Sequence, residues 1–257
     1  MSEHEGPWRA EATELSLEPG TEALVGPDTP ITHVMASMRA MRRLKPDPVP
    51  RELLTELVRA ATWAPSGSDA QHYHFVVVDG RERMAELAEL WRDCFETYEA
   101  LAGTIVPGPD SDRHRRMYDA LRYQADHFHE TPALVAAVYR RSTADGFDPR
   151  AQVDLARRLG PRRMARLARG FAAGTGTLGE ASSVYPACQN LLLAARANGL
   201  GATLTIWHLF RDADWRKALG VPKGHGIYAL IPVGWPEGRF GPVRRRPVED
   251  VLHWDRW

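Results

Sequence analysis

Two clusters of arginine stand near opposite ends of the chain, each beside proline. Arg39 and Arg42 are three residues apart and precede a turn that contains three prolines, whereas the triplet 244–246 directly precedes Pro247. The planar guanidinium group binds phosphate through two hydrogen bonds and stays charged. A single arginine is usually a solvated surface charge, but two clusters beside rigid backbone favour a phosphate-binding role.

A loop of small polar residues follows the first arginine cluster, between a predicted helix and an apolar strand. Its residues are Pro65, Ser66, Gly67, Ser68, Asp69, Ala70 and Gln71. Exposed amides and hydroxyls on such a loop can form hydrogen bonds with the edge of a flat polar ring. An ordinary connection between a helix and a strand has a similar composition, so the loop alone does not establish a ligand.

Three glycines, Gly174, Gly176 and Gly179, match the spacing of a dinucleotide-binding pattern. The pattern requires a preceding strand and an acidic residue about 20 positions later, and the chain has neither. We therefore interpret 170–179 as a flexible glycine-rich loop that leads into the next helix.

Two His-x-His pairs, 72–74 and 127–129, invite a metal-binding interpretation. On a strand this spacing places both rings on one face. No cysteine or carboxylate pattern completes either set, so we expect no metal. Cys94 and Cys188 match no metal or redox spacing, and we expect buried free thiols.

Segment 150–169 carries seven arginines and a single acidic residue, Asp154. It could contact nucleic acid or an anionic substrate. The formal net charge of the 257-residue chain is zero, whereas nucleic-acid-binding domains are usually basic. We therefore favour the solvated face of an amphipathic lid helix and expect no nucleic-acid partner.

The composition is that of a globular protein, with a hydrophobic fraction of 44%. The N-terminus lacks an apolar leader, and no apolar run approaches the roughly 20 residues that span a bilayer. We expect a cytoplasmic protein with no membrane partner. Residues 1–29 are rich in Glu, Gly and Pro and are expected to form a flexible arm.

Hydrophobic periodicity predicts the main elements. Helices are expected over 32–44, 50–61, 81–98, 113–129, 184–198 and 212–219, and strands over 74–78, 133–139, 203–206 and 227–233. The helix 184–198 is apolar almost all round, so it must be buried on more than one side. Pro232 indicates that the last strand ends there or lies at a sheet edge. The order of elements predicts an α+β fold with helices around one sheet.

Four blocks, in this order, resemble the nitroreductase family. They are residues 38–50, 64–78, 181–205, and 231–236 together with 244–251. The third block is close to a signature of that family. The resemblance covers residues 30–257 as one domain, apart from excursions near 91–125 and 141–180, which are expected to act as lids that set specificity.

The resemblance implies a central, mainly antiparallel sheet surrounded by helices, in an intertwined homodimer with FMN at the subunit interface. It assigns Arg39, Ala40, Arg42 and Arg245 to the phosphate region, although the family usually has serine at the position of Ala40. It assigns Pro65, Ser66, Gly67, Ser68, Asp69, Gln71, His208 and Leu209 to the flavin ring, although asparagine is usual at the position of Asp69. Trp207 and His208 are expected to shape the pocket of the acceptor.

The implied activity is hydride transfer from NADH or NADPH, through flavin N5, to a small electron-poor acceptor such as a nitroaromatic or a quinone. The flavin supplies this chemistry, so no catalytic side chain is expected. The departures at Ala40 and Asp69 leave two alternatives open. One is a family offshoot with a different flavin reaction, such as natural-product oxidation, dehalogenation or flavin breakdown, and the other is a non-catalytic flavin-binding dimer.

Overall fold

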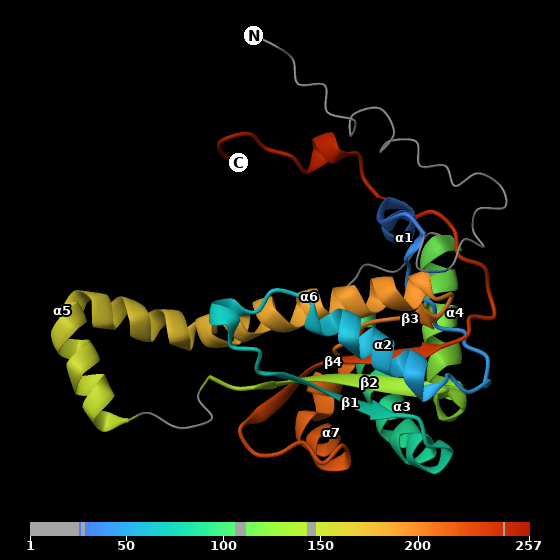
Figure 1. Ribbon diagram of the computed structural model, residues 1–257, viewed down its shortest axis with the longest axis horizontal. Coiled ribbons are helices and arrows are strands. Elements are labelled where there is room, and N and C mark those ends of the chain that lie inside the picture. Colours follow the sequence, from blue (N-terminus) through green and yellow to red (C-terminus); the bar gives the residue numbers. More distant parts are fainter. Residues whose placement is uncertain (1–25, 27–28, 106–111, 143–147, 244) are drawn as a thin grey trace, which may run out of the picture.

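The computed structural model describes residues 26, 29–105, 112–142, 148–243 and 245–257 (Figure 1). The proposed arm at 1–29 lies almost entirely outside the described residues. The helices are α1 (Ile31–Ser37), α2 (Arg51–Thr62), α3 (Arg81–Ile105), α4 (Asp112–Asp126), α5 (Pro149–Ala172), α6 (Thr175–Ala197) and α7 (Asp212–Ala218). The strands are β1 (Tyr73–Val78), β2 (Ala133–Arg140), β3 (Gly201–Ala202) and β4 (His225–Gly234). The described residues also form short 3-10 helices, namely η2 (Gly67–Asp69), η3 (Phe128–Glu130), η4 (Trp207–Arg211) and η5 (Val248–Asp250).

The four strands form one antiparallel sheet in the order β1-β2-β4-β3. Strand β2 is central and pairs on both sides, so that Val135 stands opposite Val77 of β1 and Ile231 of β4. Helices surround this sheet, which confirms the predicted α+β architecture with a mainly antiparallel sheet.

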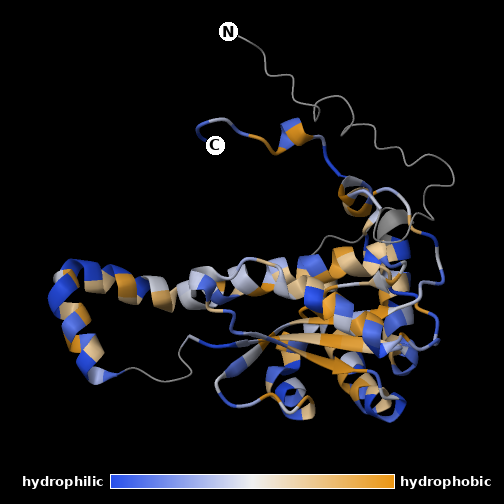
Figure 2. Cartoon of the chain, in the orientation of Figure 1, coloured by the Kyte–Doolittle hydropathy of each residue, from blue (hydrophilic) through white to orange (hydrophobic). Residues whose placement is uncertain are grey.

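The two faces of the sheet support two hydrophobic cores. Val135 and Ala137 of β2 pack in the core that α2 and α6 complete, whereas Leu134 and Val138 pack in the core that α3, α4 and α7 complete. Both sets are buried because successive side chains of a strand point to opposite faces. Figure 2 shows the resulting apolar sheet between two amphipathic helical layers.

Helix α6 carries a long run of buried residues, and Val184, Cys188 and Leu191 are fully buried along it. The predicted burial on more than one side is therefore confirmed. The helix begins at Thr175 rather than 184, so the expected loop at 170–179 is mostly helical. The first turns of α6 and all of α5 project from the body as an arm (Figure 1), and no residue of α5 is buried.

The expected helix over 32–44 ends early, at Ser37. Beyond it the backbone is extended, because Met41 N donates a hydrogen bond to Ala202 O (3.1 Å) and Leu44 forms a bridge with Pro236. Pairing with the edge of the sheet thus overrides the helical periodicity. This pairing changes the directions in which the first arginine cluster can point.

Two expectations for the last strands were also wrong. The strand expected at 203–206 is only Gly201–Ala202, followed by an isolated bridge from Thr205 to Leu230. Pro232 lies inside β4, opposite Leu134, and not at a sheet edge. Its missing N–H is tolerated because β3 is so short that it pairs only with the last two residues of β4. Among the described residues, no helix is long and apolar enough to cross a bilayer.

Candidate functional site

Arg42 and Gln124 line one small cavity of about 130 Å³. Their neighbours there are Tyr98, Met117, Leu121, Thr203, Leu204, Thr205 and Trp207. The Arg42 guanidinium is half-buried and has no hydrogen bond or ion pair within the described chain, and burial lowers its pKa from the ordinary value. The Gln124 side chain is 3% exposed, and its Nε2 has no hydrogen-bond partner.

A half-buried cation without a hydrogen bond, beside a buried amide nitrogen without a partner, is unfavourable in a folded chain. Such groups are retained where a ligand supplies the missing partners. Both Arg42 and Gln124 donate hydrogen bonds, which suits the carbonyl and ring-nitrogen edge of a flavin. The residues present therefore fit the cofactor that the sequence implied.

Arg39 does not share this cavity. In extended backbone, residues three apart point to opposite faces, so Arg39 and Arg42 diverge. Arg39 Nη2 donates to the carbonyl oxygen of Arg239 (2.8 Å), on the segment that leads to the C-terminus. Arg39 and Arg42 therefore point in different directions, and a shared contact of both with a phosphate stays a prediction.

The C-terminal segment lies beside the first arginine cluster. Val243 N donates to Ala36 O (2.8 Å), so the residues that lead to Arg245 run next to those that lead to Arg39. Arg245 and Ala40 are both exposed, and Arg244 lies outside the described residues. The structure thus brings together the two chain segments that carry the predicted phosphate arginines.

The loop from Pro65 to Gln71 is tightly held. Gly67 N donates to Ser183 Oγ (3.0 Å), Gln71 N donates to Ser66 Oγ (3.0 Å), and Gln71 Nε2 donates to Asp69 Oδ1 (2.7 Å). Three of its residues that are not glycine have positive φ, namely Ser68 (54°), Asp69 (50°) and Gln71 (49°). This conformation is uncommon for such residues and often marks a functional loop.

Within one copy of the chain, the loop from Pro65 to Gln71 lies away from Arg39 and Arg42. The loop is tied to Ser183 of α6, whereas residue 37 is tied to Arg196 of the same helix through a hydrogen bond from Arg196 Nε to Ser37 Oγ (2.8 Å). Arg196 is thirteen positions after Ser183, a rise of about 20 Å along the helix. The two predicted halves of the site are therefore attached to α6 near its middle and near its C-terminal end.

The helix η4 contributes to two cavities. Trp207 lines the small cavity and stacks on Tyr98 with ring centroids 5.1 Å apart, whereas Leu209 lines a second cavity of about 640 Å³. His208 is fully buried between them and lines neither. Its Nε2 donates to Ile227 O (2.9 Å), its Nδ1 has no partner, and burial lowers its pKa, so the ring is neutral.

Gln124 is the residue of this site that the sequence analysis missed. It lies in α4 with Leu121 and Ala125, Phe128 follows in η3, and all four are buried. A polar residue within such an apolar stripe was the available signal.

No metal site accompanies these groups in the described part of the chain, where no three histidine, cysteine or acidic side chains gather. His72 packs against Tyr139, and His74 packs against His225. Both cysteines are free and buried, as expected.

Comparison with known proteins agrees with this architecture. Residues 35–235 match the model of the Nitroreductase family. An "NADH dehydrogenase" from Thermus thermophilus is 30% identical over 229 residues, which cover 84% of this chain and 91% of the relative. The chain belongs to the Nitroreductase family, and by class it is an NAD(P)H-dependent oxidoreductase.

Two solved structures show the same fold at low identity. A BluB-like flavoprotein from Clostridium difficile 630 has a TM-score of 0.63 and 19% identity, with 89% of this chain and 100% of that chain covered. An iodotyrosine deiodinase bound to FMN and 3-iodo-L-tyrosine has a TM-score of 0.62 and 20% identity, with the same coverage.

Proposed function

We propose that the protein is an FMN-dependent oxidoreductase that passes hydride from NADH or NADPH, through flavin N5, to an electron-poor acceptor such as a nitroaromatic or a quinone. The observation that carries this proposal is the cavity lined by Arg42 and Gln124, in which the Arg42 guanidinium and Gln124 Nε2 form no hydrogen bond within the described chain. FMN bound there would supply the redox chemistry, and the protein would bind and orient it.

The directions of the arginines divide the cofactor site into two parts. Arg42 and Gln124 would hold the polar edge of the flavin ring, whose carbonyl oxygens and nitrogens accept hydrogen bonds. Arg39 and Arg245, on the two adjacent segments at the surface, would hold the phosphate. A fixed cation at the ring edge would favour negative charge on that ring, as preorganised charges do in active sites.

A second copy of the chain would complete this site. The polar loop and the arginines lie about 20 Å apart along α6, so a loop from the partner is needed to reach the ring. Trp63, next to the loop, is 74% exposed, as expected of an apolar side chain that a partner covers. We therefore propose a homodimer in which Ser66, Ser68, Asp69 and Gln71 of one copy contact the flavin bound by the other.

An alternative reaction on the same cofactor is supported by Asp69. Its carboxylate accepts the side-chain amide of Gln71 (2.7 Å), and an ionised carboxylate offers the ring no donor. The solved structures of similar fold include a BluB-like flavoprotein and a deiodinase. A branch specialised in flavin breakdown or dehalogenation is thus the second candidate.

The test is an anaerobic visible spectrum of the FMN-loaded protein before and after NADH or NADPH is added. Bleaching, followed by recovery of the flavin band when menadione or nitrobenzene is added, would support the proposed reaction. A flavin that stays oxidised would favour the second candidate. A protein that takes up no FMN would refute the cofactor site.

A further inference from the structure

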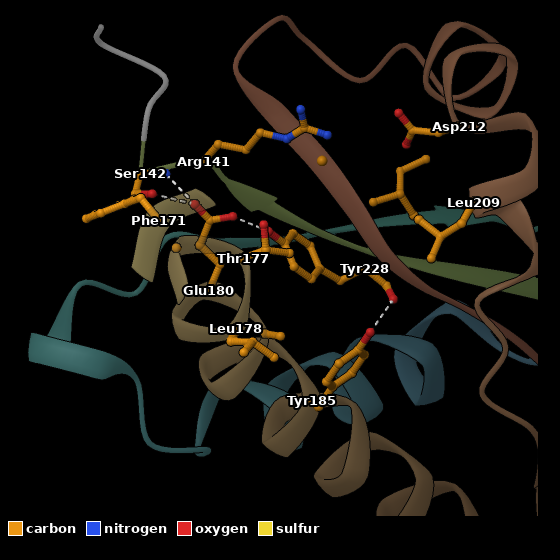
Figure 3. A pocket seen from close by; sticks show the side chains of 14 residues that line it. Arg141, Ser142, Phe171, Thr177, Leu178, Glu180, Tyr185, Leu209, Asp212 and Tyr228 are labelled. Carbon is orange, nitrogen blue, oxygen red and sulfur yellow. Dashed lines mark hydrogen bonds between the residues drawn. The ribbon is translucent and has the colours of Figure 1, made fainter. Parts of the chain in front are cut away.

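A cavity of about 640 Å³ lies where the projecting arm joins the body (Figure 3). Its walls come from the first turns of α6, the residues just after β2, the start of β4 and the end of η4. This volume lies in the range of small-molecule sites. Leu209 lines this cavity and Trp207 lines the small one, so the two cavities lie next to each other at η4.

One side of the cavity is built on a buried carboxylate. Glu180 is 8% exposed, and its Oε1 accepts hydrogen bonds from Ser142 N and Ser142 Oγ, both at 2.6 Å. Its Oε2 accepts the hydroxyl of Tyr228. Burial opposes ionisation, yet these donors and the charge of Arg141 hold the pKa of Glu180 below its usual value. Both carboxylate oxygens of Glu180 thus accept hydrogen bonds from within the chain, and they fix the backbone next to Arg141.

The side chain of Arg141 packs against the backbone, but its guanidinium forms no hydrogen bond within the described chain. Its backbone N donates to Gly224 O (2.8 Å), and its guanidinium lies flat against Gly226, where a Cβ atom would stand 2.9 Å from Nε. Only glycine leaves room for this arrangement. Among the described residues, none accepts a hydrogen bond from this guanidinium, and no carboxylate lies within ion-pair distance of it.

The other acid of the cavity is already paired. Asp212 Oδ2 accepts from Arg216 Nε at 2.9 Å. Arg141 is therefore the charged residue lining the cavity whose hydrogen-bond donors remain available to a ligand. The planar arrangement of these donors matches a carboxylate. In Figure 3 its guanidinium points into the space between the Glu180 network and Leu209.

The remaining walls suit an aromatic ring. Phe171 is 46% exposed, Leu178 is 69% exposed and Leu209 is 56% exposed, although all three line the cavity. Tyr185 adds a further ring, anchored by its hydroxyl to Tyr228 O (3.3 Å). Apolar side chains that stay this exposed around a cavity mark a ligand surface.

We infer that this cavity binds an aromatic acceptor that carries a carboxylate, with Arg141 as the residue that selects the anion. The inference rests on the proposed function, because the acceptor would take hydride from a flavin bound beside η4. For a nitro-substituted acid, one NAD(P)H and one proton convert the nitro group to a nitroso group and water. The carboxylate is unchanged by the reaction and serves only for binding.

The experiment compares 4-nitrobenzoate with 4-nitrobenzamide, an acceptor of similar shape without the charge. Arg141→Gln should lower kcat/KM for 4-nitrobenzoate by about tenfold, the lower range for a charged hydrogen bond at a partly open site. The value for 4-nitrobenzamide should stay within about twofold. Gly226→Ala, which displaces the guanidinium, should cause the same selective loss. Arg158→Gln, an exposed arginine of α5 outside the cavity, is the matched control.

Binding is measured separately, by calorimetric titration of the FMN-loaded protein with benzoate and without reduced nicotinamide. Benzoate should bind to the wild type and to Arg158→Gln, and about tenfold more weakly to Arg141→Gln. Equal binding by all three would overturn the inference, as would an unchanged preference between the two nitro compounds. If neither compound is reduced by the wild type, the proposed activity fails, and the titration alone decides whether Arg141 holds the anion.

Discussion

Arg42 and Gln124 line one cavity from segments more than eighty residues apart, and neither the Arg42 guanidinium nor Gln124 Nε2 has a hydrogen bond in the described chain. Their segments reach this position by different means. The extended strip that carries Arg42 pairs with Ala202, whereas α4 presents Gln124 from its buried face. The arrangement sacrifices stability in the absence of ligand, and this has measurable consequences.

Replacing Arg42 should separate cofactor binding from stability. Arg42→Gln removes a half-buried cation that lacks a partner, so the cofactor-free protein should keep or slightly raise its melting temperature. FMN affinity should fall by about tenfold or more, because a charge-assisted hydrogen bond is lost. Fluorescence titration of FMN and thermal melts with and without FMN give both quantities.

The control for this change is Arg43→Gln. Arg43 is the exposed neighbour on the opposite face, where its guanidinium stacks on Tyr123 at 4.3 Å. Its replacement should leave FMN affinity unchanged. A similar loss of affinity in both variants would show that general positive charge, and not the Arg42 cavity, holds the cofactor.

Two inactive variants should complement each other if the loop serves the partner's site. Arg42→Gln damages the ring edge, and Asp69→Leu with Gln71→Leu removes the polar groups of the loop. In a mixed dimer one of the two sites carries neither change. Unfolding and refolding the two variants together should restore about a quarter of wild-type activity, the share expected from random pairing. Activity no higher than the average of the separate variants would place the loop on its own copy's site.

Gly201 is expected to be intolerant of any side chain. A Cβ atom there would stand 2.8 Å from Met41 Cβ and 3.0 Å from Leu44 Cδ2. Gly201→Ala should therefore cost about 1–3 kcal/mol of unfolding free energy through overpacking. It should also weaken FMN binding, because it pushes away the strip that carries Arg42. Urea denaturation and FMN titration measure the two effects.

The matched change is Gly179→Ala in α6, where nothing lies within 4 Å of the added atom. It should raise the unfolding free energy by roughly 0.5–1 kcal/mol, since alanine is the better helix former. Equal effects of the two substitutions would mean that the contact between Gly201 and the strip has no energetic weight.

The sequence allowed the sheet, the buried part of α6 and the polar loop to be predicted, because each depends on local periodicity or composition. It did not allow the direction of Arg42 to be predicted. The apolar residues at 34, 35, 38 and 41 fit a helix, and only pairing with Gly201–Ala202, far along the chain, makes the strip extended. Gln124 was missed for the same reason, since its importance appears only when Arg42 lies beside it.

The last prediction concerns the neutral ring of His208. Burial lowers its pKa in the folded protein, although its bond to Ile227 O opposes this effect. The unfolded chain, with a histidine pKa of about 6.5, therefore takes up the proton more readily. Folding stability from this group is complete above that value and declines as pH falls below it, with a slope of at most about 1.4 kcal/mol per pH unit. Glu180, whose pKa is also lowered, reduces the folding stability only below its unfolded pKa of about 4.3.

Urea denaturation at pH 7.5, 6.5 and 5.5 should show the wild type losing stability faster than His208→Gln, which can still donate to Ile227 O but does not titrate. Parallel losses in the two proteins would contradict a proton-linked role for His208.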